Sequence, residues 1–395
     1  MHTYFTGRIK NFSLNLNKAG IIALLLLLML TKTVDAKKGP ELIQLIFTSD
    51  SHFGIKRNSF QGDSNVYSNV VNAAMVARMN TLQTVKLPDD NGINGGKLVG
   101  GIDYLINSGD IANREEPGIQ SSDVSWSQFT TVYLNGVHLT NNRNKKTEIL
   151  LLPGNHDISN AIGFTRKMVP LTDNTALVGI YNFMFPKNPR TSSSFQYSKD
   201  KVHYSINKGG IHFVFINMWP DSCERLWIEK DLQRVSKKTP VLLFAHDQPT
   251  VESKHFTNPN GSHTINLSDN FENLLPEVFK DGTKISDPSK IEQISFVEFL
   301  KVHPNIKAYF NGNDHENKMY DYTGPNNDIS LKTFQVDSPM KGNKSAKDET
   351  KLSFQLISID FRTKMMTVRE CLWNAIPKNR SAVMQWGMSR TISLN

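Results

Sequence analysis

The chain has 395 residues, a formal net charge of +8 at pH 7, 38% hydrophobic residues and 21% charged residues. This composition excludes a disordered chain, a collagen-like fibre and a membrane protein with several spans, and the length is sufficient for a large core. Charges of both signs are interspersed after residue 36, which excludes a basic stripe for nucleic acid. Cys223 and Cys371 are the only cysteines, so a disulfide framework and a cysteine-based zinc site are excluded, and whether the two pair stays open.

The first 36 residues predict a secretory signal peptide. Arg8, Lys10 and Lys18 precede an unbroken apolar run over residues 21–30, and residues 34–36 (VDA) resemble a cleavage sequence. This order is typical of signal peptides, with cleavage expected after Ala36. The sequence therefore predicts a secreted or periplasmic protein with no transmembrane span in the mature chain. An uncleaved N-terminal membrane anchor is the alternative, although the apolar run is short for a bilayer span.

Short apolar strands alternate with helical stretches along the remaining residues, 37–395. Strands are expected at 42–48, 102–107, 148–152, 202–206, 211–217, 241–245 and 306–310. Helices are expected at 66–85, 126–134, 223–235 and 290–301, where apolar residues recur at helical spacing. From Ser330 the pattern becomes strand-rich, including 354–360 and 365–369. The alternation predicts one α/β domain over residues 37–395 with a strand-rich C-terminal end.

Residues that bind divalent metals follow five of these expected strands. In chain order the motifs are Asp50-Ser51-His52, Gly109-Asp110, Gly154-Asn155-His156-Asp157, His246 and Gly312-Asn313-Asp314-His315. Asp, Asn and His supply the oxygen and nitrogen ligands of hard and borderline divalent ions. Because sites in α/β proteins assemble at the carboxyl ends of the strands, we expect these side chains to converge.

The ordered set of motifs resembles that of the calcineurin-like metallophosphoesterases. Their pattern is D-x-H, G-D, G-N-H-[DE], a lone His behind an apolar strand, and G-H-x-H. The resemblance covers roughly residues 42–320, and G-N-H-D is its most specific part. It implies an α/β fold of two β-sheets packed as a β-sandwich and flanked by helices, in four layers α/β/β/α. The strand-rich segment after Ser330 is expected to complete the second sheet.

The resemblance also implies two divalent metal ions. The first would be held by Asp50, His52, Asp110 and His315. The second would be held by Asp110, Asn155, His246 and Asn313. The family has His where this chain has Asn313, and an amide oxygen suits harder ions better than zinc-like ions. The chain lacks the tyrosine that purple acid phosphatases place shortly after G-D, so a pair of Mn, Fe or Zn ions is expected rather than an Fe(III)-tyrosinate centre.

The expected reaction is hydrolysis of a phosphate mono- or diester. A metal-bridging hydroxide would attack phosphorus, and His156 would donate a proton to the leaving alkoxide or stabilise it. Asp157 is expected to orient His156, with a helix cap as its alternative role. Asn113 and Arg114 follow the strand that ends at Asp110 and are candidates for binding a phosphate oxygen. A solvated loop is the alternative for these two residues.

Two other functions stay open. One is a binding or regulatory protein that keeps the fold but has weak or no catalysis because of Asn313. The other is a metal-dependent hydrolase of a non-phosphate ester or a pyrophosphate bond.

The polar stretch at 250–271 is expected to be a lid or specificity loop. Further candidates for shaping specificity are Trp219, Asp221, His255 and His263. The oligomeric state is not predicted.

Overall fold

The computed structural model describes residues 42–113, 120–158, 173–197, 199–251, 288–379 and 382–395, with only the backbone at 288–291. Within these ranges, residues 42–395 form one compact unit. The predicted signal peptide, Arg114, His255, His263 and nearly all of the predicted lid lie outside the described residues. None of the helices within the described ranges is long and apolar enough to cross a bilayer.

The first sheet has six strands in the order β14-β13-β12-β1-β4-β5. Their bounds are β1 Leu42–Thr48, β4 Tyr104–Asn107, β5 Glu148–Leu151, β12 Ser353–Asp360, β13 Met365–Leu372 and β14 Gln385–Ser393. β1, β4 and β5 are parallel, and β12 runs antiparallel to β1 with Leu42 opposite Asp360. β1 is buried along nearly its whole length, which explains why it is a nearly continuous apolar run.

The second sheet also has six strands, in the order β10-β11-β9-β8-β7-β6. Their bounds are β6 Tyr204–Lys208, β7 Ile211–Phe215, β8 Val241–Phe244, β9 Ile306–Asn311, β10 Lys318–Tyr322 and β11 Leu331–Gln335. β7, β8, β9 and β11 are parallel neighbours, and β6 and β10 close the two edges antiparallel. The hairpin between β6 and β7 turns at Gly209-Gly210, as the sequence predicted.

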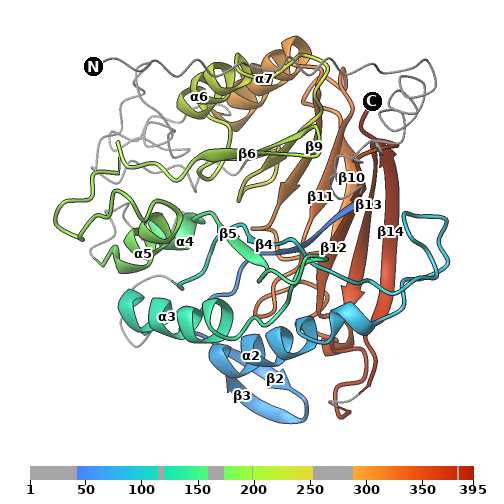
Figure 1. Ribbon diagram of the computed structural model, residues 1–395. Helices are drawn as coiled ribbons and strands as arrows, with labels where there is room; N and C mark the ends of the chain where they lie inside the picture. Colours follow the sequence, from blue (N-terminus) through green and yellow to red (C-terminus); the bar gives the residue numbers. More distant parts are fainter. Residues whose placement is uncertain (1–41, 114–119, 159–172, 198, 252–287, 380–381) are drawn as a thin grey trace, which may run out of the picture. The chain divides into compact units, whose positions relative to one another are not determined.

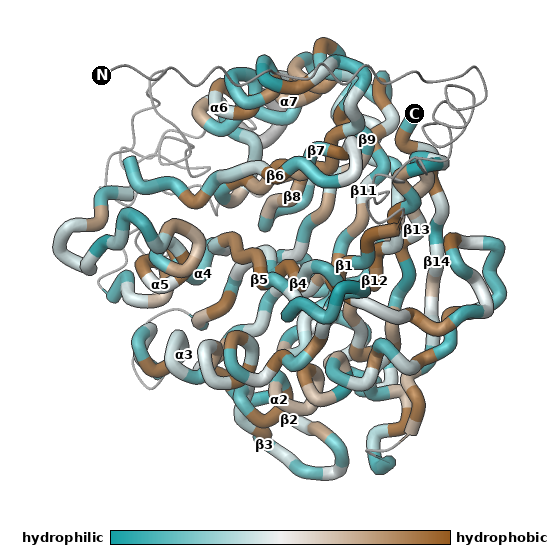
Figure 2. The backbone as a smooth tube through the Cα atoms, viewed as in Figure 1, coloured by the Kyte–Doolittle hydropathy of each residue, from teal (hydrophilic) through white to brown (hydrophobic). Residues whose placement is uncertain are grey.

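The two sheets pack face to face through aromatic side chains. The ring of Phe47 on β1 lies 5.8 Å from that of Phe244 on β8 and 5.6 Å from that of Phe310 on β9, edge to face in both cases. Figure 1 shows α6 (Ser222–Leu232) and α7 (Pro288–Val302) beside the second sheet, and α2 (Ser68–Met79) and α3 (Ser122–Phe129) beside the first. Figure 2 shows hydrophobic residues on the strands between these helices. The predicted four-layer α/β/β/α sandwich is confirmed.

Shorter elements complete the fold. They are β2 Lys56–Phe60, β3 Asp63–Tyr67, η1 Leu82–Thr84, the π-helical segment η2 Thr130–Leu134, α4 Asn155–Ile158, α5 Thr175–Met184 and η6 Glu349–Lys351. The sequence did not predict the β2–β3 hairpin, because both strands are mostly polar and exposed and show no apolar alternation. The helix predicted at 66–85 is also shorter than expected. Its first residues belong to strand β3 of the hairpin, and its last residues include η1.

The expectation for the strand-rich C-terminal end is wrong in one respect. β11 joins the second sheet, but β12, β13 and β14 extend the first sheet from the edge of β1. In the parallel order β1-β4-β5, the edge of β1 that faces away from β4 has no partner. Pairing with β12 satisfies the backbone N–H and C=O groups on this edge of β1. Cys223 on α6 and Cys371 on β13 do not form a disulfide, and Cys371 Sγ packs 3.6 Å from Met384 Sδ.

Candidate metal centre

The carboxyl ends of strands from both sheets meet at one place, as the sequence predicted. Asp50 and Asp110 follow the parallel strands β1 and β4, and the amide of Asp50 donates to the carbonyl of Gly109 at 2.9 Å. His246 follows β8 in the second sheet, and the amide of Gly312, after β9, donates to its carbonyl at 3.0 Å. These backbone bonds fix the loops that carry the polar side chains.

The backbone at this place is strained. Five of the predicted ligand residues have left-handed φ values: Asp50 57°, His52 43°, Asp110 52°, Asn313 64° and His315 52°. Such conformations cost about 1–3 kcal/mol each for residues other than glycine and cluster at functional sites. These backbone conformations therefore reduce the stability of the fold, and they direct the side chains toward one another.

Two glycines permit the close approach of the loops. A Cβ atom on Gly154 would collide with the amide nitrogen and Oδ1 of Asp110, and one on Gly109, whose φ is +114°, would collide with the amide nitrogen of Gly154. The G-D and G-N-H motifs thus need glycine because their backbones touch.

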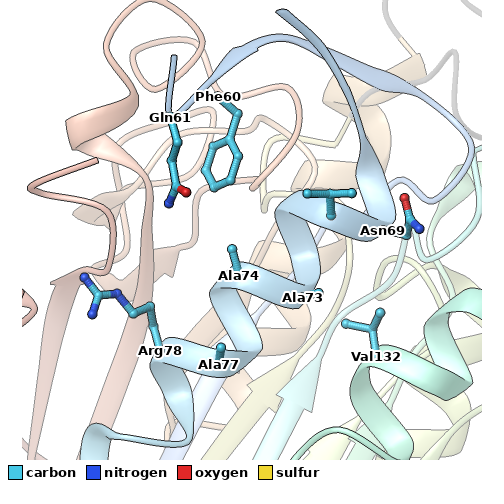
Figure 3. A pocket seen from close by; sticks show the side chains of 9 residues that line it. Phe60, Gln61, Asn69, Ala73, Ala74, Ala77, Arg78 and Val132 are labelled. Atoms are coloured by element: carbon cyan, nitrogen blue, oxygen red, sulfur yellow. The ribbon is translucent and has the colours of Figure 1, made fainter. Parts of the chain in front are cut away.

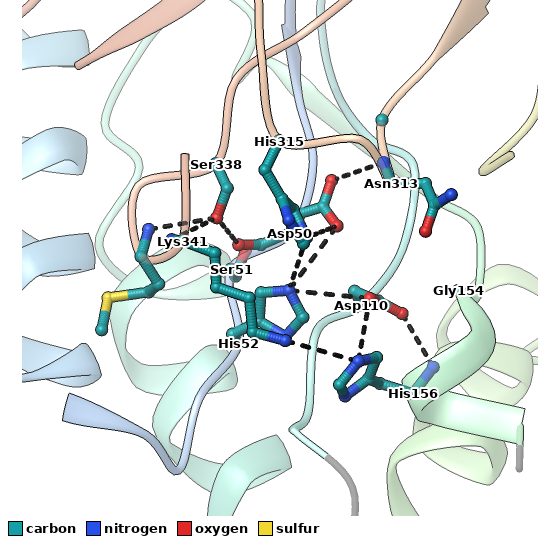
Figure 4. A network of polar contacts seen from close by, with 12 residues as sticks. Asp50, Ser51, His52, Asp110, Gly154, His156, Asn313, His315, Ser338 and Lys341 are labelled. Atoms are coloured by element: carbon teal, nitrogen blue, oxygen red, sulfur yellow. Dashed lines mark hydrogen bonds and ion pairs between the residues drawn. The ribbon is translucent and has the colours of Figure 1, made fainter. Parts of the chain in front are cut away.

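The first group of ligand atoms is compact (Figure 4). His52 Nε2 lies 3.6 Å from Asp50 Oδ1, 3.6 Å from Asp110 Oδ2 and 3.2 Å from His315 Nε2. Asp50, His52 and Asp110 are almost fully buried, and one ligand atom from each of the four residues lies within 4.8 Å of the others. Two carboxylate oxygens and two imidazole nitrogens match the ligand preference of zinc-like divalent ions.

The protonation of this group also fits a cation. Burial, with a further contribution from the charge of Lys341, lowers the pKa of His52 to about 3. His52 is therefore a neutral imidazole, the form that coordinates metals. Asp50 Oδ1 is buried without a well-aligned hydrogen bond and faces the His52 and His315 rings. A cation at this point would satisfy that oxygen.

The second group of ligand atoms surrounds His246. Its Nε2 lies 3.4 Å from Asp110 Oδ1 and 3.1 Å from Asn155 Oδ1, and its Nδ1 is 2.9 Å from the carbonyl of Ser108, which fixes the ring. Burial acts to lower the pKa of His246, but the Asp110 carboxylate outweighs it and raises this pKa to about 10. The negative charge of Asp110, which holds a proton on His246, would equally favour a divalent cation at this point.

Asn313 has a different arrangement from the other predicted ligands. Its backbone amide donates to Asp50 Oδ2 at 2.9 Å, and its side-chain Nδ2 donates to Gln248 Oε1 at 2.8 Å. Both Asn313 and Gln248 are 8% exposed. The structure therefore brings Asn313 to the edge of the cluster with its amide nitrogen bound to Gln248.

His156 lies beside the first group. Its Nε2 is 3.7 Å from Asp110 Oδ2, its ring centroid is 4.7 Å from that of His52, and its backbone amide donates to Asp110 Oδ1 at 2.8 Å. The side chain is 9% exposed, so one edge of this ring reaches the surface of the site.

The role of Asp157 as the residue that orients His156 stays a prediction, and the contacts that the structure describes for its carboxylate are with backbone amides. Asp157 Oδ1 accepts a hydrogen bond from the amide of Ala112 at 2.9 Å, and Oδ2 accepts from the amides of Gly154 at 2.9 Å and Ile111 at 3.2 Å. Its carboxylate thus joins the loop after β4 to the loop after β5. Three backbone amides thus bind both oxygens of this fully buried side chain, and the carboxylate satisfies these donors.

The remaining candidates are only partly placed. Asn113 is 5% exposed, its amide donates to the carbonyl of Phe53 at 2.8 Å, and its side-chain oxygen is buried without a hydrogen-bond donor among the described residues. Trp219 is fully buried and donates to the carbonyl of Gln248 at 3.1 Å. Asp221 caps α6 by accepting from the amide of Glu224 at 2.9 Å. The role of Trp219 and Asp221 in specificity stays a prediction.

Sequence reasoning missed Lys341, Ser338 and Gln248. Lys341 Nζ lies 3.4 Å from His156 Nε2, and Ser338 Oγ donates to the carbonyl of Asp50 at 2.8 Å. Both follow β11, in a segment without any motif, so no local signal could have identified them. Gln248 follows His246 by two positions, and this proximity is the one signal the sequence offered.

A separate cavity of about 460 Å³ lies on α2 (Figure 3). Ala73, Ala74 and Ala77 of α2 form its floor, with Phe60 on one side and Val132 on the other. Its lining comes from α2, the β2–β3 hairpin and η2, whereas the polar cluster comes from loops at the strand ends.

The comparison with family models agrees with this geometry. The family model described as calcineurin-like phosphoesterase matches residues 43–316. Among solved structures, a single mutant of Vps29 from Entamoeba histolytica aligns with 8% identity and a TM-score of 0.32, covering 89% of this chain and 100% of that one. Wild-type Vps29 of the same organism, complexed with Zn²⁺, aligns with 8% identity, a TM-score of 0.31 and the same coverage.

The calcineurin-like phosphoesterase YfkN from Bacillus subtilis aligns with 11% identity and a TM-score of 0.28, covering 89% of this chain and 91% of that one. No curated protein matches the chain. The family model spans most of the described fold and every motif that contributes to the polar cluster, and the chain belongs to the calcineurin-like phosphoesterase family.

Proposed function

We propose that this protein is an exported, metal-dependent phosphoesterase that hydrolyses phosphate mono- or diesters. The observation that carries the proposal is the position of Asp110, whose Oδ2 faces His52 at 3.6 Å while its Oδ1 faces His246 at 3.4 Å. One carboxylate between two groups of ligand atoms can bridge two cations. When bound, such a pair of divalent ions polarises phosphoryl oxygens and lowers the pKa of water toward neutrality.

The residues of the chain divide into two ligand sets in this proposal. The first set is Asp50, His52, Asp110 and His315. The second set is Asp110, Asn155 and His246, with Asn313 at its edge. Mn, Fe or Zn are the ions that this mixture of carboxylate, imidazole and amide ligands favours.

His156 is proposed to act on the leaving group. Its ring borders the first ligand set without belonging to it, and its side chain is 9% exposed. A ring in this position can donate a proton to the departing alkoxide or hold it by a hydrogen bond. With His156→Ala, we expect turnover to fall by about 10²–10⁴-fold at unchanged metal content. Intact turnover would remove His156 from the reaction.

Export is supported by the sequence of residues 1–36 alone. N-terminal sequencing of the protein recovered outside the cytoplasm should give Lys37 as its first residue. Recovery of the intact N-terminus in a membrane fraction would instead support the anchored alternative.

The test of the activity combines metal counting with two substrates. The purified protein should bind two divalent ions and release nitrophenol from p-nitrophenyl phosphate or its bis ester, and a chelator should stop the release. Asp110→Asn should abolish both metal binding and turnover, whereas Asp63→Asn, an exposed carboxylate on β3, should change neither. Two bound ions without turnover on either ester would contradict the proposal.

A binding or regulatory protein of the same fold is the second candidate. It is favoured by Asn313 itself, whose amide is a weaker ligand for zinc-like ions than the imidazole expected at this position and whose Nδ2 donates to Gln248 Oε1. This candidate predicts one bound ion or none, and no chelator-sensitive turnover.

A further inference from the structure

We propose that Lys341 binds the phosphoryl group of the substrate and selects dianionic phosphate monoesters over monoanionic diesters. The inference rests on the proposed function and names the substrate class within it. Its basis is the position of the ammonium group, because Lys341 Nζ lies 3.4 Å from His156 Nε2, beside the first ligand set (Figure 4).

The loop that carries Lys341 is attached to the ligand-bearing segments at two points. Ser338 Oγ donates to the carbonyl of Asp50 at 2.8 Å and accepts from the amides of Met340 and Lys341 at 3.1 Å each. Farther along the loop, the amide of Asn343 donates to the carbonyl of His315 at 2.9 Å. The base of the lysine is therefore fixed relative to both Asp50 and His315.

A buried arginine holds the same loop from the other side. Arg57 on β2 is 3% exposed, and its guanidinium donates to the carbonyls of Pro339 at 3.1 Å, Met340 at 3.4 Å and Ser345. A buried cation needs such acceptors, so the loop and the arginine stabilise each other. Because these contacts hold the loop, Lys341 gives up less conformational entropy on binding than a lysine on a free loop would.

The chemistry of the ligand follows from the charge and the donors of lysine. An ammonium group is a compact point charge with three donors and no acceptor, so it binds an anionic oxygen. A phosphate monoester carries one more ionised oxygen than a diester, in which an alkyl group replaces that charge. A cation at Lys341 therefore gains more from a monoester than from a diester of similar size.

Lys344 provides a matched control on the same loop. Its side chain is 71% exposed and pairs with Glu316 at 2.6 Å, and Glu316 keeps a second partner, Lys318, at 3.0 Å. Lys344→Met thus removes the same charge from the same loop without removing the last partner of Glu316.

The experiment measures binding rather than turnover. Orthophosphate and dimethyl phosphate are titrated by calorimetry into the metal-loaded wild type, Lys341→Met, Lys341→Arg and Lys344→Met. In Lys341→Met we expect the orthophosphate Kd to rise by about tenfold, or about 1.4 kcal/mol, with the dimethyl phosphate Kd and the metal content unchanged. Lys341→Arg should recover part of the affinity, and Lys344→Met should match the wild type.

Unchanged orthophosphate binding in Lys341→Met, or an equal loss for both anions, would overturn the role of Lys341 while leaving the proposed function in place. Failure of the proposed function has a different signature, since the wild type would then bind no metal or would bind two ions and release no nitrophenol from either ester. Either result would overturn both proposals. Thermal unfolding of each variant confirms that the fold is retained.

Discussion

The side-chain amide of Asn313 donates to Gln248 Oε1 at 2.8 Å, while the backbone amide of the same residue donates to Asp50 Oδ2 at 2.9 Å. The backbone of Asn313 is therefore fixed against one predicted ligand, and its side chain is held by Gln248. An amide pair at this position presents neutral oxygen and nitrogen atoms in place of an imidazole. This arrangement bears directly on which ion the second ligand set prefers.

Replacing Asn313 by His should shift the metal preference. Imidazole is a better ligand than an amide oxygen for zinc-like ions, so we expect Asn313→His to bind the second Zn²⁺ about tenfold more tightly while its Mn²⁺ affinity changes less. Competition titration with a chromophoric chelator measures both affinities. Asn188→His, at an exposed position, is the control. An unchanged or weaker Zn²⁺ affinity would place the second ion away from residue 313.

Metal removal should destabilise the fold. Asp50 and Asp110 are buried near each other, and a bound cation offsets their repulsion. At free metal of 100 times its Kd, binding to the native state alone adds about 2.7 kcal/mol to the free energy of unfolding. Thermal unfolding with Mn²⁺ and with a chelator measures the difference. Asp110→Asn should not respond to metal, and Asp63→Asn should respond like the wild type.

Much of the fold and of the candidate centre could be predicted from the sequence. β1, β8 and β9 are short apolar runs bounded by polar motifs. Because sites in α/β proteins assemble at the carboxyl ends of the strands, the sequence alone predicted that Asp50, Asp110 and His246 lie together. These signals are local, because each motif lies within a few residues of its strand.

The missed features depend on contacts between distant segments. Lys341 reaches His156 across 185 positions because Arg57, on a hairpin that the sequence did not predict, holds its loop. The partners of Asp157 were also missed. A carboxylate after G-N-H fits a histidine-orienting role and a backbone-binding role equally well, and the amides that Asp157 binds come from the loop after β4, which is distant in sequence.

Asp157→Asn should reduce stability. The asparagine has one acceptor oxygen, so its NH₂ group would face a backbone amide that Asp157 now binds, and we expect a loss of about 1–3 kcal/mol in the free energy of unfolding. Urea denaturation in the presence of chelator measures it. If Asp157 instead oriented His156, the variant would keep its stability and change the pH profile of turnover.

The ion pair of Asp90 and Arg369 should make stability depend on pH in the acid range. Arg369 on β13 is fully buried and binds both oxygens of Asp90 at 2.8 and 2.9 Å. Burial acts to raise the pKa of Asp90, but the hydrogen bonds from Arg369 and from the amide of Gly92 outweigh it and lower this pKa to about 2. The folded state therefore binds this proton less readily than the unfolded chain does.

Because the folded pKa is lowered, the contribution of Asp90 is fully present above pH 4 and is lost as the pH falls toward 2. Its size is about 2 kcal/mol, from a shift of nearly two pKa units. We expect Asp90→Asn to be less stable than the wild type at pH 6, with the difference shrinking toward pH 2 in urea denaturation with chelator. Asp89→Asn, whose side chain is 80% exposed, should follow the wild type throughout. A difference that stays constant from pH 6 to pH 2 would mean that Asp90 acts through packing rather than through its charge.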